Sequence, residues 1–358
     1  MSVRQFVYKA HPSRVIFGTG TASKVRDEVE RLGRSRVLLL ASPRLTALTE
    51  KIEGVLGPLA VARFDGAAMH TPVEVTEQAL EVLRAHSADC VVAVGGGSTT
   101  GLAKALGART GVDQVILPTT YAGSEVTPVL GETDKGVKTT RSSPEILPET
   151  VIYDVDLTLG LPVPVSVASG VNALAHAVEA LYSPEANPVI DLLALRSVSG
   201  VAAALPVIAR DPADAAARAD LLQAAWLAGI CLSSVGMSLH HKLCHTLGGS
   251  FALPHAETHT VVLPHAMAYN APAAPEAMAR IVEALGADDA PAGVYDLISS
   301  VDGPLSLREL GMAEKELGRA AQLATARPYP NPRELTTDGI ERLLRAAWHG
   351  DRPSRTGR

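Results

Sequence analysis

Residues 90–100 read Cys90-Val91-Val92-Ala93-Val94-Gly95-Gly96-Gly97-Ser98-Thr99-Thr100. The first five are apolar, and a short uninterrupted apolar run is typical of a strand that is buried on both faces. Three glycines end the run, and a helix-like stretch follows over 99–106. A buried strand that passes through a glycine turn into a helix indicates a parallel sheet covered by helices.

Three more runs of this kind lie in the first 155 residues. They are Val37–Leu40, 115–117 and 151–153, and a proline or an aspartate follows each of them closely. Helix-like stretches, such as 75–85, lie between the runs. This alternation of strand and helix predicts an α/β domain with a parallel, Rossmann-like sheet.

From about Thr158 onward, helical periodicity replaces the strand pattern. Val171, Leu174, Ala175, Val178 and Leu181 have the spacing of one apolar face of an amphipathic helix. Residues 192–204 and 213–232 are also long, apolar and rich in alanine. We therefore predict two domains, an α/β domain over 1–160 and an all-α domain over 161–358.

The composition is that of a globular protein of 358 residues, with 47% hydrophobic and 20% charged residues. The net charge is −6 and no cluster of lysine or arginine stands out, so we expect no nucleic-acid partner. The three cysteines form no CxxC pair, which is typical of a reducing compartment. Neither a signal peptide nor an uncharged apolar run of membrane-spanning length is found, so we expect a cytoplasmic protein with no membrane partner.

Gly95, Gly96, Gly97 and Ser98 form a candidate phosphate-binding turn. Glycine lets the backbone approach a ligand without a Cβ in the way, and the N–H groups at the start of a helix attract anions. The pattern is neither GxGxxG nor a Walker A sequence, and an ordinary tight turn would use the same glycines.

A second polar turn carries Thr119, Thr120 and Ser124 after the run at 115–117. Ligands of open α/β sheets bind at the carboxyl ends of the strands, so two such turns favour a nucleotide site over two unrelated loops. After Val37–Leu40 no acidic residue follows, and Arg44 could pair with a 2′-phosphate. Both NADH and NADPH are therefore expected to serve.

Histidines are concentrated in one part of the predicted helical domain. Six of the 11 lie between His240 and His265. His241 and His245 share one helical face, as do His255 and His259, because each pair is spaced i, i+4. Asn172, His176 and Glu179 are spaced i, i+4 and i+7, which places them together on the polar side of the upstream amphipathic helix.

Clustered imidazoles suggest a metal site. The sequence around His241 lacks the glutamate of HExxH, which excludes a zinc-protease reading. Cys244 is a weak nucleophile candidate, and a free cysteine of this kind is more often packed in the core.

The chain resembles the iron-containing (group III) alcohol dehydrogenase family over nearly its whole length. The motifs that carry the resemblance are Phe17-Gly18-Thr19-Gly20, GGGS at 95–98, PTT at 118–120, GSEVT at 123–127, Lys138, Leu147-Pro148, SGVNALAHAVE at 169–179 and Leu263-Pro264-His265. The resemblance implies a nucleotide-binding α/β domain, a helical domain and an active site in the cleft between them.

In that family an aspartate and three histidines hold the metal, and the matching positions here are Asn172, His176, His241 and His255. The carboxylate is therefore an amide, which removes the strongest oxygen ligand for a hard divalent ion. The threonine turn is also one residue shorter than the common PTTxGTGSE form. Both departures, with Phe6-Val7-Tyr8 and RVIFG at 14–18, resemble the maleylacetate-reducing branch, whose members work without a required metal.

The resemblance implies an NAD(P)H-dependent reduction of maleylacetate to 3-oxoadipate in the catabolism of aromatic compounds. The expected catalytic residues are His241, His245 and His255. The expected substrate-binding residues are Asn172, His176 and Lys242. The expected cofactor-binding residues are Ser42, Gly95, Gly96, Gly97, Ser98, Thr119, Thr120, Ser124 and Lys138. We expect NADH or NADPH as cofactor, no required metal, a small dicarboxylate as substrate and a homodimer.

Three alternatives stay open at this point. A metal-dependent alcohol or lactaldehyde dehydrogenase could tolerate Asn172. A lyase of the dehydroquinate synthase type shares the expected fold but recycles its NAD. A nucleotide sensor without catalysis would not need so many histidines.

Overall fold

The computed structural model describes residues 5–135 and 137–354, with the backbone alone for 137 and 138. The chain forms two compact units. One is His11–Leu161, and the other combines Pro162–Arg358 with the first ten residues. The division lies one residue beyond the boundary expected from the sequence, which had also assigned the first ten residues to the α/β domain.

The α/β unit is built on a six-stranded parallel sheet with the order β1-β8-β5-β4-β2-β3. The strands are β1 (Arg14–Gly18), β2 (Val37–Leu40), β3 (Ala60–Phe64), β4 (Cys90–Gly95), β5 (Asp113–Pro118) and β8 (Thr150–Asp154). Every residue of β2, β4 and β8 is buried. The predicted runs are these strands and β5, so the parallel sheet is confirmed.

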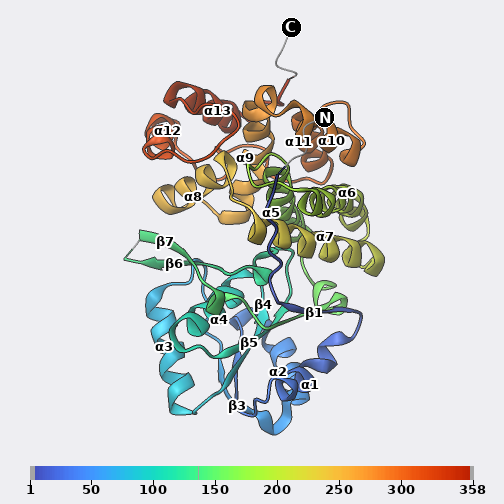
Figure 1. Ribbon diagram of the computed structural model, residues 1–358, viewed down its shortest axis with the longest axis vertical. Coiled ribbons are helices and arrows are strands. Elements are labelled where there is room, and N and C mark those ends of the chain that lie inside the picture. The colour runs from blue at the N-terminus through green and yellow to red at the C-terminus, as the bar shows by residue number, and fades with distance from the viewer. Residues whose placement is uncertain (1–4, 136, 355–358) are drawn as a thin grey trace. The chain divides into compact units, whose positions relative to one another are not determined.

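Helices cover both faces of this sheet (Figure 1). On one face α1 (Val25–Arg31) and α2 (Thr46–Leu56) pack against alternate residues of β2, β4 and β5. On the other lie α3 (Val73–Ala85) and α4 (Gly97–Thr110). Because both faces are covered, the central strands are apolar throughout instead of alternating.

Four strands had no clear sequence signal. The edge strands β1 and β3 are only partly buried. The strands β6 (Val129–Asp134) and β7 (Val137–Ser142) form a separate antiparallel hairpin rich in polar residues. Partial burial needs no continuous apolar run, which explains why these strands do not stand out.

In the described residues beyond 161, the second unit contains helices and no strand. They are α5 (Val163–Leu181), α6 (Pro188–Arg210), α7 (Ala215–Ser234), α8 (Leu239–Phe251), α9 (His255–Asn270), α10 (Pro275–Leu285), α11 (Ala290–Ser300), α12 (Leu317–Thr325) and α13 (Thr337–His349). The predicted fold class, an α/β domain followed by an all-α domain, is confirmed.

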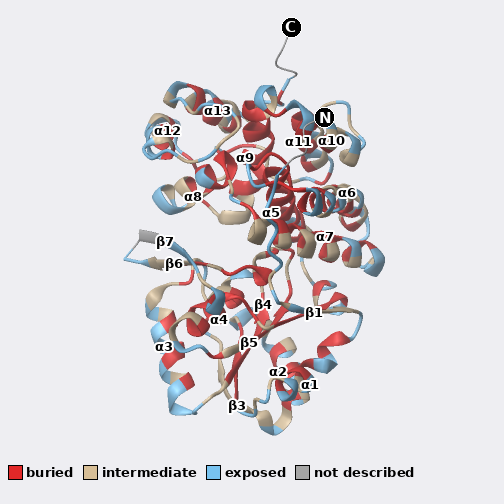
Figure 2. Cartoon of the chain, in the orientation of Figure 1, coloured by how far each residue is buried: buried red, intermediate tan, exposed pale blue. Residues whose placement is uncertain are grey.

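Helix α5 differs from the amphipathic helix expected. All its residues from 166 to 181 are buried, because α6, α7 and α9 pack around it (Figure 2). Its polar side therefore faces other helices and not solvent. Asn172, His176 and Glu179 lie in the interior of the unit, where each needs a partner or a ligand.

Helices α6 and α7 are long and apolar enough to span a membrane by length and composition. Charged residues interrupt both helices, so neither is an uncharged apolar run in the sequence. Asp191 of α6 pairs with Arg280 at 2.9 Å, and Arg218 of α7 is fully buried. Internal charges that are paired within the fold are typical of core helices.

Candidate functional site

The predicted phosphate-binding residues meet at one edge of the parallel sheet. β2, β4 and β5 are neighbours in the sheet. Ser42 follows the carboxyl end of β2, the glycine turn follows β4, and Thr119 follows β5. From β2 the chain continues to β3 on one side and later returns to β4 on the other. The ends of β2 and β4 therefore form a topological switch point, where doubly wound sheets bind nucleotides.

Two of the three glycines are required by close packing. Gly95 has a φ of 152°, and a Cβ there would lie 2.3 Å from Thr99 Oγ1. A Cβ on Gly96 would lie 2.9 Å from Thr120 Cγ2. Gly97 is different, because a Cβ there meets no described atom within 4 Å. The space beside Gly97, at the first turn of α4, is thus open to a ligand.

No side chain caps the N-terminus of α4. The N–H groups and the positive dipole end of this 14-residue helix can therefore receive a phosphate. Thr119 donates its backbone N–H to the carbonyl of Gly95 at 3.0 Å, which joins the two predicted turns. The structure thus brings the turn after β5 against the turn after β4.

A buried lysine holds the loop that contains Ser124. Lys104 Nζ donates to the carbonyl of Ser124, to Thr127 Oγ1 at 2.9 Å and to the carbonyl of Val129 at 3.0 Å. The sequence had not singled out Lys104. The predicted Lys138 lies on β7, and its side chain is outside the described part of the structure.

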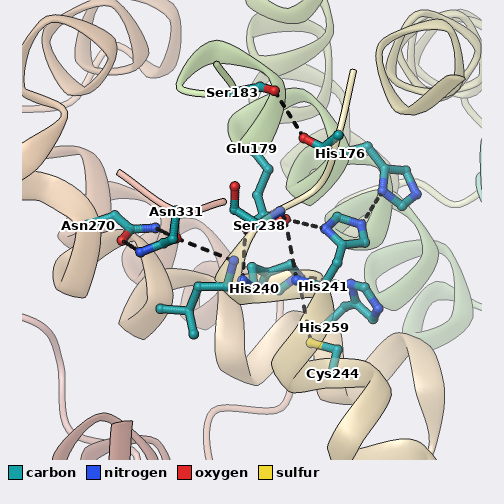
Figure 3. Close-up of polar contacts among 12 residues, drawn as sticks. His176, Glu179, Ser183, Ser238, His240, His241, Cys244, His259, Asn270 and Asn331 are labelled. Carbon is teal, nitrogen blue, oxygen red and sulfur yellow. Dashed lines mark hydrogen bonds and ion pairs between the residues drawn. The ribbon is translucent and has the colours of Figure 1, made fainter. Parts of the chain in front are cut away.

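The helical unit brings the predicted histidines together from α5, α8 and α9, and Figure 3 shows His176 and His241 among them. His176 Nδ1 lies 2.6 Å from His241 Nε2, and their rings are stacked. The ring centroids of His245 and His255 are 6.4 Å apart. His245 and His255 are half-buried, whereas His176 and His241 are buried behind them.

Glu179 organises the buried part of this cluster. Its carboxylate accepts the backbone N–H groups of Ser238 at 3.0 Å and His240 at 2.8 Å, at the start of α8. It also accepts His241 Nδ1–H at 2.6 Å. The next hydrogen bond joins His241 Nε2 to His176 Nδ1 at 2.6 Å. A carboxylate–imidazole–imidazole chain results, and it holds both rings in defined orientations.

A second histidine pair lies behind the first. His240 Nε2 and His259 Nδ1 are 2.9 Å apart, and His259 packs against His255 with ring centroids 4.5 Å apart. Burial and the neighbouring imidazoles lower the pKa of His240 and of His259 well below the usual value, so both are neutral near pH 7. These rings support the site but supply no positive charge to it.

Cys244 lies beside this pair and is completely buried. Burial raises the pKa of its thiol, which keeps the sulfur protonated. The core-packing interpretation of Cys244 is therefore favoured over a nucleophile. His240, Cys244 and His259 place one ligand-type atom each within 4.8 Å of one another.

Lys242, predicted to bind the substrate, points away from the histidine cluster. Its side chain is exposed, and Nζ lies 5.9 Å from the centroid of the Tyr329 ring. The sequence predicts no role for three residues that take part in these contacts, namely Glu179, His240 and His259. The available signal was spacing, because Glu179 follows His176 by three residues and His259 follows His255 by four.

Comparison with known proteins identifies the class. The sequence-family model for iron-containing alcohol dehydrogenase matches residues 12–155. The family model for the C-terminal part of Fe-containing alcohol dehydrogenases matches residues 166–348. The chain belongs to the iron-containing alcohol dehydrogenase family.

Within the family, several similar chains are named maleylacetate reductase. Maleylacetate reductase 1 of Rhodococcus opacus is 62% identical and aligns over 98% of both chains. Maleylacetate reductase of Rhizobium sp. is 51% identical over 98% of this chain and 100% of that protein. The crystal structure of maleylacetate reductase from Agrobacterium tumefaciens has a TM-score of 0.95 at 52% identity, and covers 98% of this chain and 100% of that one. The predicted resemblance to an oxidoreductase of this branch is confirmed.

The family's name implies iron, and the residues at its metal positions do not fit such an ion. Asn172 supplies a neutral amide, and its Oδ1 is buried without a hydrogen-bond partner among the described residues. His176 Nδ1 and His241 Nε2 share a hydrogen bond at 2.6 Å, so one of these two nitrogens carries a proton and does not face an ion in this arrangement. A hard divalent cation prefers anionic oxygen. We therefore derive no step through a metal.

Proposed function

We propose that this protein reduces the carbon–carbon double bond of maleylacetate to give 3-oxoadipate, a step in the catabolism of aromatic compounds. The supporting observation is its 62% identity to Maleylacetate reductase 1 of Rhodococcus opacus over nearly the whole of both chains. NADH or NADPH binds at the β2–β4 switch point and supplies the hydride. Gly97 and the uncapped start of α4 receive the pyrophosphate.

The chemistry needs one hydride and one proton. Hydride adds to the alkene carbon that is β to the ketone, and the alkene electron pair moves to give an enolate with its charge on the ketone oxygen. A proton then adds to the carbon next to the carbonyl, which restores the ketone and leaves a single carbon–carbon bond. The enzyme must therefore stabilise an oxyanion and supply a proton.

The histidine cluster provides both functions in this proposal. His245 and His255 are half-buried, so they can touch the substrate, and we assign them to the enolate and to proton donation. His241 is held by Glu179 and acts through His176. Asn172, whose buried amide has no described partner at its oxygen, contacts the substrate together with His176. Lys242 attracts the substrate's carboxylates.

Metal independence belongs to the same proposal. A simple aldehyde needs a Lewis acid to polarise its carbonyl. An alkene conjugated to a ketone is already activated, and hydrogen-bond donors can carry the enolate charge.

The test is NADH and NADPH oxidation by the purified protein with maleylacetate, with and without EDTA, and with the product analysed by mass spectrometry. We expect cofactor oxidation matched by 3-oxoadipate, unaffected by the chelator. Activity that is lost on chelation and restored by a divalent ion would favour the metal-dependent alcohol dehydrogenase. Turnover without net cofactor oxidation would favour the lyase.

We also propose a cytoplasmic homodimer with no nucleic-acid or membrane partner. Strand β1 lies at an open edge of its sheet, and the preceding segment exposes Phe6 and Val7 by 50% and 91%. An open sheet edge and exposed apolar side chains each favour pairing with a second chain. Analytical ultracentrifugation should give twice the monomer mass, and a monomer at micromolar concentration would contradict the dimer.

A further inference from the structure

A pocket of about 300 Å³ lies in the helical unit, outside the histidine cluster. Its walls come from the segment 325–335 between α12 and α13, and include Arg327, Tyr329, Asn331, Arg333 and Glu334. This volume is at the lower end of small-molecule sites.

The pocket adjoins the first turn of α8. Asn331 Oδ1 accepts the backbone N–H of Leu239 at 3.4 Å, and Asn331 exchanges two hydrogen bonds with Asn270 at 2.8 and 3.0 Å. Lys242 on the same turn reaches over the Tyr329 ring. The pocket is thus tied to the helix turn that carries His240 and His241.

The charge near the pocket is predominantly positive. Arg327 and Arg333 line it and Lys242 borders it through Tyr329, against one carboxylate, Glu334. Arg333 is anchored, since Nη1 donates to the carbonyl of Tyr269 at 3.0 Å and its guanidinium stacks on that ring. Fixed cations of this kind suit a carboxylate.

We propose that this pocket binds the carboxylate of the substrate that is remote from the reacting alkene, through the exposed side chains of Arg327 and Lys242. The inference rests on the proposed function, because it names the part of the maleylacetate site that selects a dicarboxylate. The histidines hold the conjugated half of the molecule, and the segment 325–335 holds its carboxymethyl end.

Truncation of the substrate gives a sharp test. The compound 4-oxopent-2-enoate is maleylacetate without the remote carboxylate, and it retains the same conjugated alkene. For Arg327→Gln and Lys242→Gln we expect kcat/KM with maleylacetate to fall about ten- to a hundredfold, the loss of one charge-assisted hydrogen bond, mainly through KM. With 4-oxopent-2-enoate we expect wild type and variants to be equal within about twofold. Lys315→Gln, which removes an exposed charge on the turn before α12, is the matched control.

The outcomes separate the two proposals. Equal losses of kcat/KM with both substrates would indicate a merely structural role and would overturn the carboxylate pocket. Variants with the kcat/KM of the wild type on maleylacetate would also overturn it. If the wild type fails to oxidise NADH with maleylacetate, the proposed function fails. The pocket is then tested by calorimetric titration with adipate, which should bind the wild type and lose affinity in Arg327→Gln. Equal adipate affinity in both proteins would overturn it.

Discussion

Asn172 differs from an aspartate by a single group at the end of its side chain. It lies on α5 one turn before His176, within the interior of the helical unit. A neutral amide leaves the histidines without a strong anionic oxygen ligand, so the preference for a metal can depend on this one residue.

Asn172→Asp should create a metal site. The two side chains are nearly isosteric, so the variant should fold normally. Its carboxylate should tighten the binding of Zn²⁺ or Fe²⁺ by about tenfold or more, which corresponds to about 1.4 kcal/mol. The new charge should also impair maleylacetate reduction in EDTA, because it repels the substrate's carboxylates and opposes the enolate. Calorimetric metal titration and assays in EDTA measure both effects.

A suitable control is Asn187→Asp, at the N-cap of α6, where Asp caps as well as Asn. It should change neither property. Tight stoichiometric metal binding by the wild type, with activity lost on chelation, would contradict the metal-free site and favour the alcohol dehydrogenase alternative.

Glu179→Gln tests the carboxylate–imidazole chain. The amide keeps the shape but loses the charge, and its NH₂ group faces N–H donors, so His241 loses its fixed tautomer. We expect kcat to fall by about a hundredfold with little change in KM, and the free energy of unfolding to fall by about 1–3 kcal/mol. Steady-state kinetics and urea unfolding measure these quantities. Glu283→Gln, on the exposed side of α10, is the control. Unchanged kcat in Glu179→Gln would remove this chain from the mechanism.

At the scale of elements, the β4–α4 turn combines packing and binding in three adjacent glycines. Gly95 and Gly96 are held by their neighbours, whereas Gly97 faces open space. Substitutions in this turn should therefore have two different consequences.

Gly97→Val should fold and lose cofactor. No described atom lies within 4 Å of the added Cβ, so the branched side chain meets the pyrophosphate and little else. We expect the Kd for NADH to rise by about tenfold or more, with the unfolding midpoint almost unchanged. Gly95→Ala, whose Cβ would lie 2.3 Å from Thr99 Oγ1, should instead lose stability. Equal NADH affinity in Gly97→Val and wild type, measured by fluorescence titration, would exclude this turn from the site.

The end of β2 governs the choice of cofactor. It continues into the 3-10 turn Pro43–Leu45, where Arg44 is exposed and no carboxylate follows the strand. Without an acidic residue to bind the ribose hydroxyls, NADPH is not repelled. We expect both cofactors to support turnover. A preference for NADH beyond roughly a thousandfold, about 4 kcal/mol, would contradict this prediction.

For the whole molecule, buried neutral histidines link stability to pH. Burial lowers the pKa of His265 from 6.5 to about 4. The unfolded chain then binds more protons than the folded chain between these values, so the free energy of unfolding decreases as the pH falls from about 6.5 to 4. His265 alone should remove about 2 kcal/mol by pH 5. Urea unfolding at pH 7 and pH 5 should show a smaller loss for His265→Asn, and equal losses would contradict the assignment.

Much of the α/β unit could be predicted because its signals are local. A strand buried on both faces must be apolar at every position, so β2, β4, β5 and β8 stand out in the sequence. The glycines after β4 are also a local signal. Gly95 and Gly96 are required by close packing in the turn, and they mark the start of α4. The edge strands β1 and β3 are only partly buried and carry no such signal.

The sequence by itself determined the class of fold, the family and most members of the histidine cluster, because these follow from patterns a few residues long. Only the tertiary structure decided what those residues contact. Glu179 reaches His241 across 62 positions of the chain, and Asn331 reaches Leu239 across 92. It also placed the polar side of α5 in the interior, because three helices surround it. Contacts between distant segments depend on how whole helices pack, and no local pattern encodes that packing.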